Sequence, residues 1–386
     1  MGGRSAVVVG GGIGGLAAAV ALHRTGWDVV VLERAEEFTE VGAGLSLWPN
    51  AMRALVALGL ADRVRAIGAV EAAGGVRDRT GRWLSRLDNA VIARRHGWPL
   101  LVVHRADLVR VLVEALPPSV PHPAAEVRAV RADGDAAVVE HRGGTVRADL
   151  VVGADGLRSA VRRSCWPEAR EPGYSGCTAW RTITDPLPDP RPDGAVLWGR
   201  GERFGYTALP GGRFYCFAAA VVPEGGADEP GAVARRFADW PHPVPALLAA
   251  MPEDRLLRHD VHDLPPLSTF VRGRVVLLGD AAHAMDPMLG QGACQALEDA
   301  VTLADRLAAT PDVDAALAAY DAERRPRTQA VVRRSARLAA VTRWTWPPAV
   351  AARDLAARLV PAALTLRAMA PVLDWTPPRS AEGVGL

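Results

Sequence analysis

The first 32 residues constrain the fold more than any other part of the chain. A β-branched run, Ser5–Val9, leads directly into GGGIGG at residues 10–15, and an apolar helical pattern follows as far as Thr25. Asp28–Leu32 is a second short apolar run, typical of a buried parallel strand. A strand, a glycine-rich turn, a helix and a second strand within about 30 residues form the opening unit of a doubly wound α/β sheet.

The spacing of the glycines predicts a dinucleotide-binding turn. Gly10, Gly12 and Gly15 form G-x-G-x-x-G: the first allows the tight turn, the second lets a pyrophosphate approach the backbone, and the third lets the helix pack on the strand. The helix N-terminus then faces the phosphates with its N–H groups. Glu33, at the end of the second strand, can accept both hydroxyls of an adenosine ribose. These features favour a bound dinucleotide over a glycine turn without a ligand, but they do not distinguish a flavin from a nicotinamide.

A different pattern occupies the middle of the chain. From Tyr174 to Val222 short aromatic runs alternate with Gly and Pro, and Gly211-Gly212 marks a hairpin. We expect an antiparallel sheet inserted into the α/β domain. Arg274–Leu278 then returns to a buried strand, and helices follow from about Gln291 to the C-terminus.

Composition excludes several classes of function. With 45 basic against 43 acidic residues, the net charge of +2 gives no footprint for nucleic acid. None of the basic residues is lysine, which excludes a catalytic lysine. The four cysteines lack C-x-x-C spacing, so we expect reduced thiols and no metal site. No signal-peptide pattern and no uninterrupted apolar stretch of membrane-spanning length occurs, so we expect a cytoplasmic protein.

Three further motifs carry a family resemblance. HRADLVRVL stands at residues 104–112, GADGLRSAVR at 153–162, and GDAAHAMDPMLGQGACQALEDA at 279–300. With the N-terminal unit, and in this order, they make the chain resemble the single-component FAD-dependent aromatic hydroxylases, the para-hydroxybenzoate hydroxylase-like group. The resemblance covers nearly the whole chain.

The resemblance implies a division of the α/β fold into three parts. A Rossmann-like FAD-binding domain would comprise residues 1–70, 101–172 and 271–340. An inserted antiparallel substrate-binding domain would comprise 71–100 and 173–270. Residues 341–386 would form a C-terminal helical segment.

The resemblance also implies roles for charged residues around FAD. Arg105 would contact the pyrophosphate, for which a guanidinium fork is suited; its alternative is a surface arginine at a helix start. Asp155 would belong to a second fingerprint shared by FAD and the nicotinamide cofactor, or would form a turn. Asp280 would hold a ribityl hydroxyl. The backbone N–H groups of Gly290, Gly292 and Ala293 would face the flavin pyrimidine ring and stabilise negative charge there. The complete expected set of cofactor contacts is Gly10, Gly12, Ile13, Gly14, Gly15, Glu33, Arg34, Gly44, Leu45, Arg105, Asp155, Asp280, Pro287, Gly290, Gly292 and Ala293.

The substrate side is less defined by sequence. Because alternate residues of a strand face opposite sides, each aromatic residue of the expected sheet either lines the pocket or belongs to the core or outer face. Asp286, before Pro287, stands where a neutral residue is commoner in the family. It either caps a turn or brings a charge to the substrate or flavin, and it is the sole catalytic candidate. His283 is expected to be structural. The aromatic candidates for the pocket lining are Trp48, Trp180, Trp198, Tyr206, Tyr215 and Phe217.

The expected function is that of an FAD-dependent monooxygenase, a hydroxylase or an epoxidase. The resemblance implies NAD(P)H as reductant, O2 as oxygen source, a flavin C4a-hydroperoxide, and a small aromatic or polycyclic natural product as substrate, as in secondary metabolism. FAD is expected to be non-covalent, because no His or Cys lies in an attachment pattern. The alternatives are an FAD-dependent dehydrogenase or reductase of the same superfamily and a non-catalytic flavoprotein that sequesters a ligand. A monomer and a homodimer both remain open.

Overall fold

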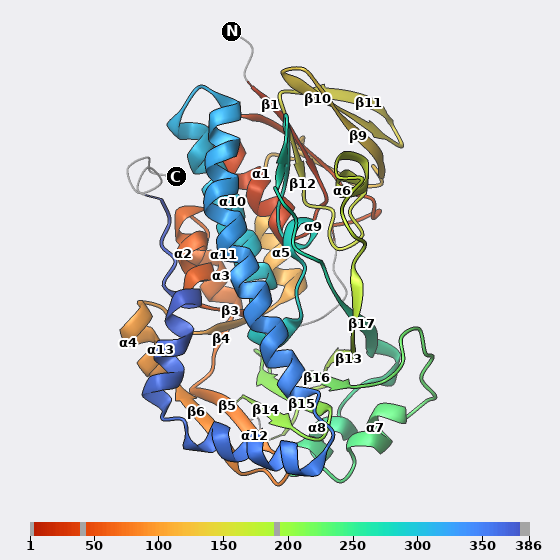
Figure 1. Cartoon of the computed structure of the whole chain (residues 1–386), viewed down its shortest axis with the longest axis vertical. Helices are drawn as coiled ribbons and strands as arrows, with labels where there is room; N and C mark the ends of the chain where they lie inside the picture. Colours follow the sequence, from red (N-terminus) through yellow and green to blue (C-terminus); the bar gives the residue numbers. More distant parts are fainter. Residues whose placement is uncertain (1–3, 39–43, 189–193, 379–386) are drawn as a thin grey trace.

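The computed structural model describes residues 4–38, 44–188 and 194–378. Two large sheets lie towards opposite ends of the molecule, and the long helix α11 (Val313–Thr342) runs from the region of the first towards that of the second (Figure 1). This arrangement confirms the predicted α/β fold with an inserted second sheet.

The six-stranded sheet carries the dinucleotide motif. Its strands are parallel except for the β18–β19 pair, and β1 lies between β2 and β12. The helix α1 (Ile13–Arg24) packs beside this sheet between α5 (Arg105–Val113) and α10 (Gly292–Ala309), and it contacts both. Ligands bind such sheets at the carboxyl ends of the strands, where the strand order reverses. In spatial order the strands are β18 (Val271–Arg272), β19 (Val275–Leu277), β12 (Leu150–Gly153), β1 (Ser5–Val9), β2 (Asp28–Leu32) and β8 (Pro121–His122).

The seven-stranded sheet contains the aromatic region. It is antiparallel apart from one parallel pair, β14 with β5, so the inserted sheet is mixed. One face packs against α7 (Ala232–Phe237) and α8 (Val244–Ala249) in an apolar core of its own. The predicted hairpin at Gly211-Gly212 joins β15 to β16. The order is β17 (Leu257–Asp263), β13 (Gly173–Ile183), β16 (Phe214–Ala220), β15 (Glu202–Ala208), β14 (Ala195–Trp198), β5 (Ala73–Asp78) and β6 (Trp83–Asp88).

Smaller elements complete the fold. One three-stranded sheet consists of β9 (Val127–Asp133), β10 (Ala136–His141) and β11 (Gly144–Ala148). A second consists of β3 (Gly44–Leu47), β7 (Leu101–His104) and β4 (Ala69–Val70). The other helices are α2 (Pro49–Ala57), α3 (Ala61–Ile67), α4 (Asn89–His96), α6 (Ala160–Cys165), α9 (Asp280–His283), α12 (Pro347–Leu359) and α13 (Ala362–Leu373), with the 3-10 turns η1 (Glu253–Arg255) and η2 (Pro287–Leu289).

A buried ionic cluster fixes α10 against α11. The Arg324 side chain donates to Glu298 Oε2 at 2.5 Å and to Asp299 Oδ1 at 2.7 Å, and all three side chains are fully buried. Asp299 Oδ2 also accepts the Gly279 N–H at 3.0 Å and lies 2.6 Å from His283 Nε2. Burial alone would raise the pKa of Asp299, but His283 and Arg324 hold that pKa well below its ordinary value. His283 is therefore structural, as predicted, and the cluster anchors the Gly279–Asp280 turn.

No single helix among the described residues is long and apolar enough to cross a membrane. The helices α12 and α13, which meet at a bend of 93°, meet the length and composition criteria only when taken together.

Candidate functional site

A cavity of about 840 Å³ lies between the two large sheets. One side is formed by the carboxyl ends of β1, β2 and β12 with the turns that follow them, and the other by a face of the seven-stranded sheet. The segment Pro287–Ala293 borders the space between them. The cavity thus joins the dinucleotide motif to the inserted sheet.

The glycine turn after β1 has the geometry of a phosphate cradle. Gly10 has φ +107°, and a Cβ there would overlap the Ala154 carbonyl, so only glycine fits. Gly12 is the N-cap residue of α1 and has no side chain to accept a hydrogen bond, so the first N–H groups of the helix remain facing the cavity. Glu33 accepts the Gly11 N–H at 2.6 Å with one oxygen and the Ala35 N–H at 2.8 Å with the other.

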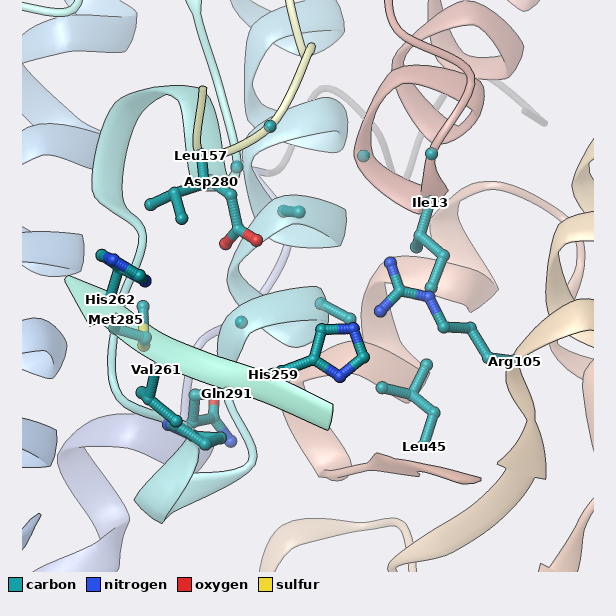
Figure 2. Close-up of a pocket in the computed structure, with 18 of the residues that line it drawn as sticks. Ile13, Leu45, Arg105, Leu157, His259, Val261, His262, Asp280, Met285 and Gln291 are labelled. Carbon is teal, nitrogen blue, oxygen red and sulfur yellow. The ribbon is translucent and has the colours of Figure 1, made fainter. Parts of the chain in front are cut away.

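Two opposite charges point toward one another across the cavity. Figure 2 shows Arg105 of α5 and Asp280 of α9 approaching from opposite sides, with the His259 ring nearby. Burial lowers the pKa of Arg105, and the negative charge of Asp280 opposes that shift. The guanidinium suits a phosphate and the carboxylate suits a sugar hydroxyl.

Asp155 serves as a helix cap while lining the same cavity. Its carboxylate accepts the Ser159 hydroxyl at 2.5 Å and the N–H groups of Ala160 and Val161 at 2.6 and 3.1 Å, at the start of α6. Burial raises the pKa of Asp155, and these donors oppose the shift. The turn-forming role expected as the alternative is therefore present in the structure.

Backbone amide groups border the cavity where α10 begins. Gly290 adopts φ +59°, and the Gln291 N-cap makes no side-chain cap hydrogen bond, so the N–H groups of the first turn face the cavity wall. The Cys294 thiol lies 3.5 Å from both the Ser46 and the Gly290 carbonyl oxygens, which holds this turn against β3. The result is a positive helix end aimed at the middle of the cavity.

All expected cofactor contacts except Gly15 line this cavity. A Cβ on Gly15 would overlap the Gly10 carbonyl, so this glycine lets α1 pack against the turn without touching the cavity. One continuous space is surrounded by the other expected contacts. These are the remaining glycines, the charged residues, the flanking Ile13, Arg34 and Leu45, and residues of the Pro287–Ala293 segment.

Strand alternation divides the aromatic set. Trp198, Tyr215 and Phe217 line the cavity. Trp180 pairs with Ala218 and Tyr206 with Cys216, which puts both on the opposite face of the sheet, in the core against α7 and α8. The expectation that Trp180 and Tyr206 line the pocket is therefore corrected: each is one position out of phase with the cavity face.

Trp48 is also outside the lining. It caps α2 and packs against Val331, Val372 and Leu373 of α11 and α13. Its indole Nε1 would lie 3.2 Å from a Cβ on Gly290, so it supports that turn from behind.

Two glycines make room for the aromatic rings. A Cβ on Gly205 of β15 would overlap the Phe217 ring, and a Cβ on Gly44 of β3 would overlap Tyr215. Burial raises the pKa of Tyr215, so its hydroxyl stays protonated at neutral pH. A side chain at either glycine would move an aromatic wall of the cavity.

Three polar residues that were not expected from the sequence share this sheet face. Arg181, Arg203 and His259 all line the cavity. The Arg203 guanidinium is buried and donates to the Thr342 hydroxyl at 2.8 Å and to the Cys177 thiol at 3.4 Å, both uncharged. Burial lowers the pKa of His259, and the nearby Arg181 and Arg105 lower it further. No local motif marks these residues; only the register of the strands brings them together.

Asp286 is buried but does not line the cavity. Its carboxylate caps η2 by accepting the Met288 N–H at 3.2 Å and pairs with Arg343 at 2.5 Å. The capping interpretation thus matches the geometry, and the capping carboxylate is buried.

A glycine cradle joined through one cavity to a buried aromatic sheet face defines a flavoprotein oxidoreductase. The chain belongs to the family described as FAD binding domain, whose model matches residues 4–213 and 258–335. The residues around the cavity fit this cofactor, because the cradle excludes any Cβ at Gly10 and the two helix N-termini have no side-chain caps.

Relatives of this chain support the same class. It is 40% identical to aurachin C monooxygenase/isomerase of Stigmatella aurantiaca, over 89% of this chain and 90% of that protein. It is 38% identical to 3-amino-4-hydroxybenzoate 2-monooxygenase of Streptomyces cremeus, over 86% of each. Klebsiella pneumoniae HpxO, solved with FAD and uric acid, superposes with a TM-score of 0.89 at 30% identity, over 96% of each chain. The chain is an FAD-dependent monooxygenase, of a family in which NAD(P)H is the usual reductant.

Proposed function

We propose that this chain inserts one oxygen atom from O2 into an electron-rich aromatic ring bound between the Pro287–Ala293 segment and the cavity face of the seven-stranded sheet. The observation that carries the proposal is the continuity of the cavity from the glycine cradle to Trp198, Tyr215 and Phe217. Bound FAD supplies the reaction with O2, and the chain supplies position, exclusion of water and charge.

The charges favour a ring that carries an acidic group. The carboxylates that line the cavity near the cradle are Glu33, Glu126, Asp155 and Asp280. On the sheet, Asp260 pairs with Arg258 at 3.0 Å, and the cavity face also presents Arg181 and Arg203. A buried guanidinium with neutral partners attracts a phenolate, an enolate or a carboxylate. An ionised ring hydroxyl makes the ring more nucleophilic, as hydroxylation requires.

The same geometry supports a set of proposed cofactor contacts. Under this proposal the cradle and Arg105 hold the pyrophosphate, Glu33 the ribose, and Asp280 the ribityl chain. The N–H groups at the start of α10 stabilise negative charge on the flavin ring. Residues 1–70, 101–172 and 271–340 then form the FAD-binding part, and 71–100 with 173–270 the substrate-binding part; residues 1–3, 39–43 and 189–193 lie outside the described residues.

We further propose that the enzyme acts in the cytoplasm, where NAD(P)H is available, as a monomer or a homodimer. Purified protein should contain FAD that acid or heat releases, because no covalent attachment pattern occurs in the sequence.

A screen of NAD(P)H oxidation tests the proposal. Phenolic, quinolone and polycyclic acceptors, each with a matched O-methylated or decarboxylated analogue, are added to the holoenzyme under 18O2. The expected result is substrate-stimulated NAD(P)H consumption and a product containing one 18O atom, with the acidic member of each pair preferred. Reduction or dehydrogenation of an acceptor without incorporation of 18O would favour the dehydrogenase or reductase alternative. Binding without turnover would favour the sequestering protein.

A further inference from the structure

The C-terminal helices expose an apolar surface. Among the described residues, six of the nine large hydrophobic side chains that are strongly exposed lie within 21 residues, from Trp344 to Leu364. We name this set the C-terminal apolar surface; it comprises Trp344, Trp346, Leu355, Leu359, Val360 and Leu364, which are 42–71% exposed.

Small apolar residues join these side chains into one patch. On α12 the exposed positions include Pro348, Ala351, Ala352 and Ala356, and residues 359–364 are all exposed and all apolar. A surface helix normally turns polar residues outward. A contiguous apolar face of this kind marks a site of interaction with another molecule or with a membrane.

The opposite side of α12 is already occupied. Arg353 is buried, donates to the Gly199 carbonyl at 3.1 Å and lies over the Trp198 ring at 5.3 Å. The helix contacts β6, and Figure 1 shows it running across one end of the molecule beside β5 and β6. The apolar face is therefore the outer one, and folding of the described chain leaves it uncovered.

The charged residues around the C-terminal apolar surface are arginines, or are carboxylates paired with an arginine. From Trp344 to Ala370 the sole carboxylate is Asp354, which pairs with Arg353 at 2.8 Å. Arg358, which also pairs with Asp78, and Arg367 are exposed. A surface of this composition complements an anionic one.

The shape of the segment favours an orientation along a membrane rather than across it. α12 and α13 have 13 and 12 residues, too few to span a bilayer singly, and they meet at 93°. Exposed tryptophans, leucines and arginines on such helices are typical of segments that lie at the level of the lipid headgroups.

We propose that the C-terminal apolar surface binds the surface of an anionic lipid bilayer, with α12 lying in the plane of the headgroups. Leu355 and Leu359 insert among the acyl chains, the tryptophans lie at the interface, and Arg358 and Arg367 contact the lipid phosphates.

Vesicle flotation of the FAD-bound protein tests this proposal. We expect the wild type to float with phosphatidylcholine vesicles that contain phosphatidylglycerol, and more weakly with phosphatidylcholine alone or at high salt. The double variant Leu355→Gln/Leu359→Gln should lose about 10-fold or more of vesicle partitioning, because it removes the two leucine side chains that would be buried among the acyl chains. Its FAD content and melting temperature should match those of the wild type.

A matched control isolates the surface. Val56→Gln/Val70→Gln replaces two exposed apolar residues outside the patch, 49% and 56% exposed, and should float like the wild type. Failure of the wild type to float with anionic vesicles, or equal flotation of the Leu355/Leu359 variant, would overturn the proposal. So would light scattering that shows a wild-type dimer which the variant converts to a monomer, since the surface would then be a contact between two copies.

Discussion

Replacing Arg324 by methionine removes the cation from a cluster in which nothing is exposed to water. Arg324 bonds Glu298 at 2.5 Å and Asp299 at 2.7 Å, and it also donates to the Gln295 side chain at 2.9 Å. In the variant, Glu298 still accepts hydrogen bonds from Arg327 and Asn50, each at 2.7 Å. Of its partners among the described residues, Asp299 retains His283 and the Gly279 N–H. The variant therefore leaves one buried carboxylate poorly compensated.

Breaking such a buried pair costs about 3–5 kcal/mol. The entropy of unfolding is about 0.8 kcal/mol/K near 60 °C for a chain of 386 residues. The melting temperature of Arg324→Met should consequently fall by about 4–6 °C. Thermal unfolding followed by circular dichroism, with FAD in excess, measures this shift.

The neighbouring residue provides the control. Arg325 pairs with Asp321 at 3.0 Å, but its side chain is 32% exposed, and surface pairs contribute about 1 kcal/mol or less. Arg325→Met should thus lower the melting temperature by about 1 °C at most. The combined loss in Arg324→Met/Asp299→Asn should be smaller than the sum of the two single losses, because both changes act on one pair. Equal melting of the Arg324 and Arg325 variants would refute this account of the cluster.

Four other predictions test the site. Glu33→Ala and Asp280→Ala should each weaken FAD binding by about 10- to 100-fold in a fluorescence titration, since each removes a charged acceptor; normal FAD affinity in both would contradict the assignment. Gly205→Ala should displace the Phe217 ring, because the added Cβ would overlap it. FAD should stay bound, while the KM for the substrate and the share of NAD(P)H oxidised to form peroxide should change. Gly173→Ala is the control and should change neither quantity, because its Cβ would meet no atom within 4 Å. The pKa of His259 is lower in the folded than in the unfolded chain, so the unfolded state binds more protons, and the free energy of unfolding should fall as pH drops through about 6.5. In urea titrations at several pH values, His259→Gln should reduce this pH dependence of the free energy of unfolding. An unchanged pH dependence in the variant would contradict the prediction. Asp286→Asn should lower the melting temperature and leave the pH–rate profile of hydroxylation unchanged, because the carboxylate pairs with Arg343; a shifted profile would return Asp286 to a role at the substrate.

Elements that depend on local sequence were predicted well. Ser5–Val9 and Asp28–Leu32 are strands with the predicted bounds, and α1 ends one residue before the predicted Thr25. A glycine turn, an apolar helix face and a β-branched run each carry their own structural preference, so neighbours in sequence were sufficient. The hairpin at Gly211-Gly212 followed from the same kind of local signal.

Features that depend on register were not predictable in the same way. Trp180 and Arg181 are adjacent, yet only Arg181 faces the cavity, because the pairing of β13 with β16 decides the face. Asp286 meets Arg343, 57 residues away, only after α11 has packed beside η2. The sequences of β5 and β6 favour a strand only weakly; β5, for example, contains Gly74 and Gly75. Pairing of these segments within the sheet stabilises them as strands.

The end of the chain contributes to the substrate chamber from outside the family-matched region. The family match stops at residue 335, yet Leu338 lines the cavity, Arg343 holds Asp286, and Arg353 lies over Trp198. The same tail also reaches the cofactor side, because Val372 and Leu373 pack against Trp48, which lies behind the Gly290 turn. A tail taken from a relative would therefore change the wall near Trp198 and the support of the Gly290 turn together.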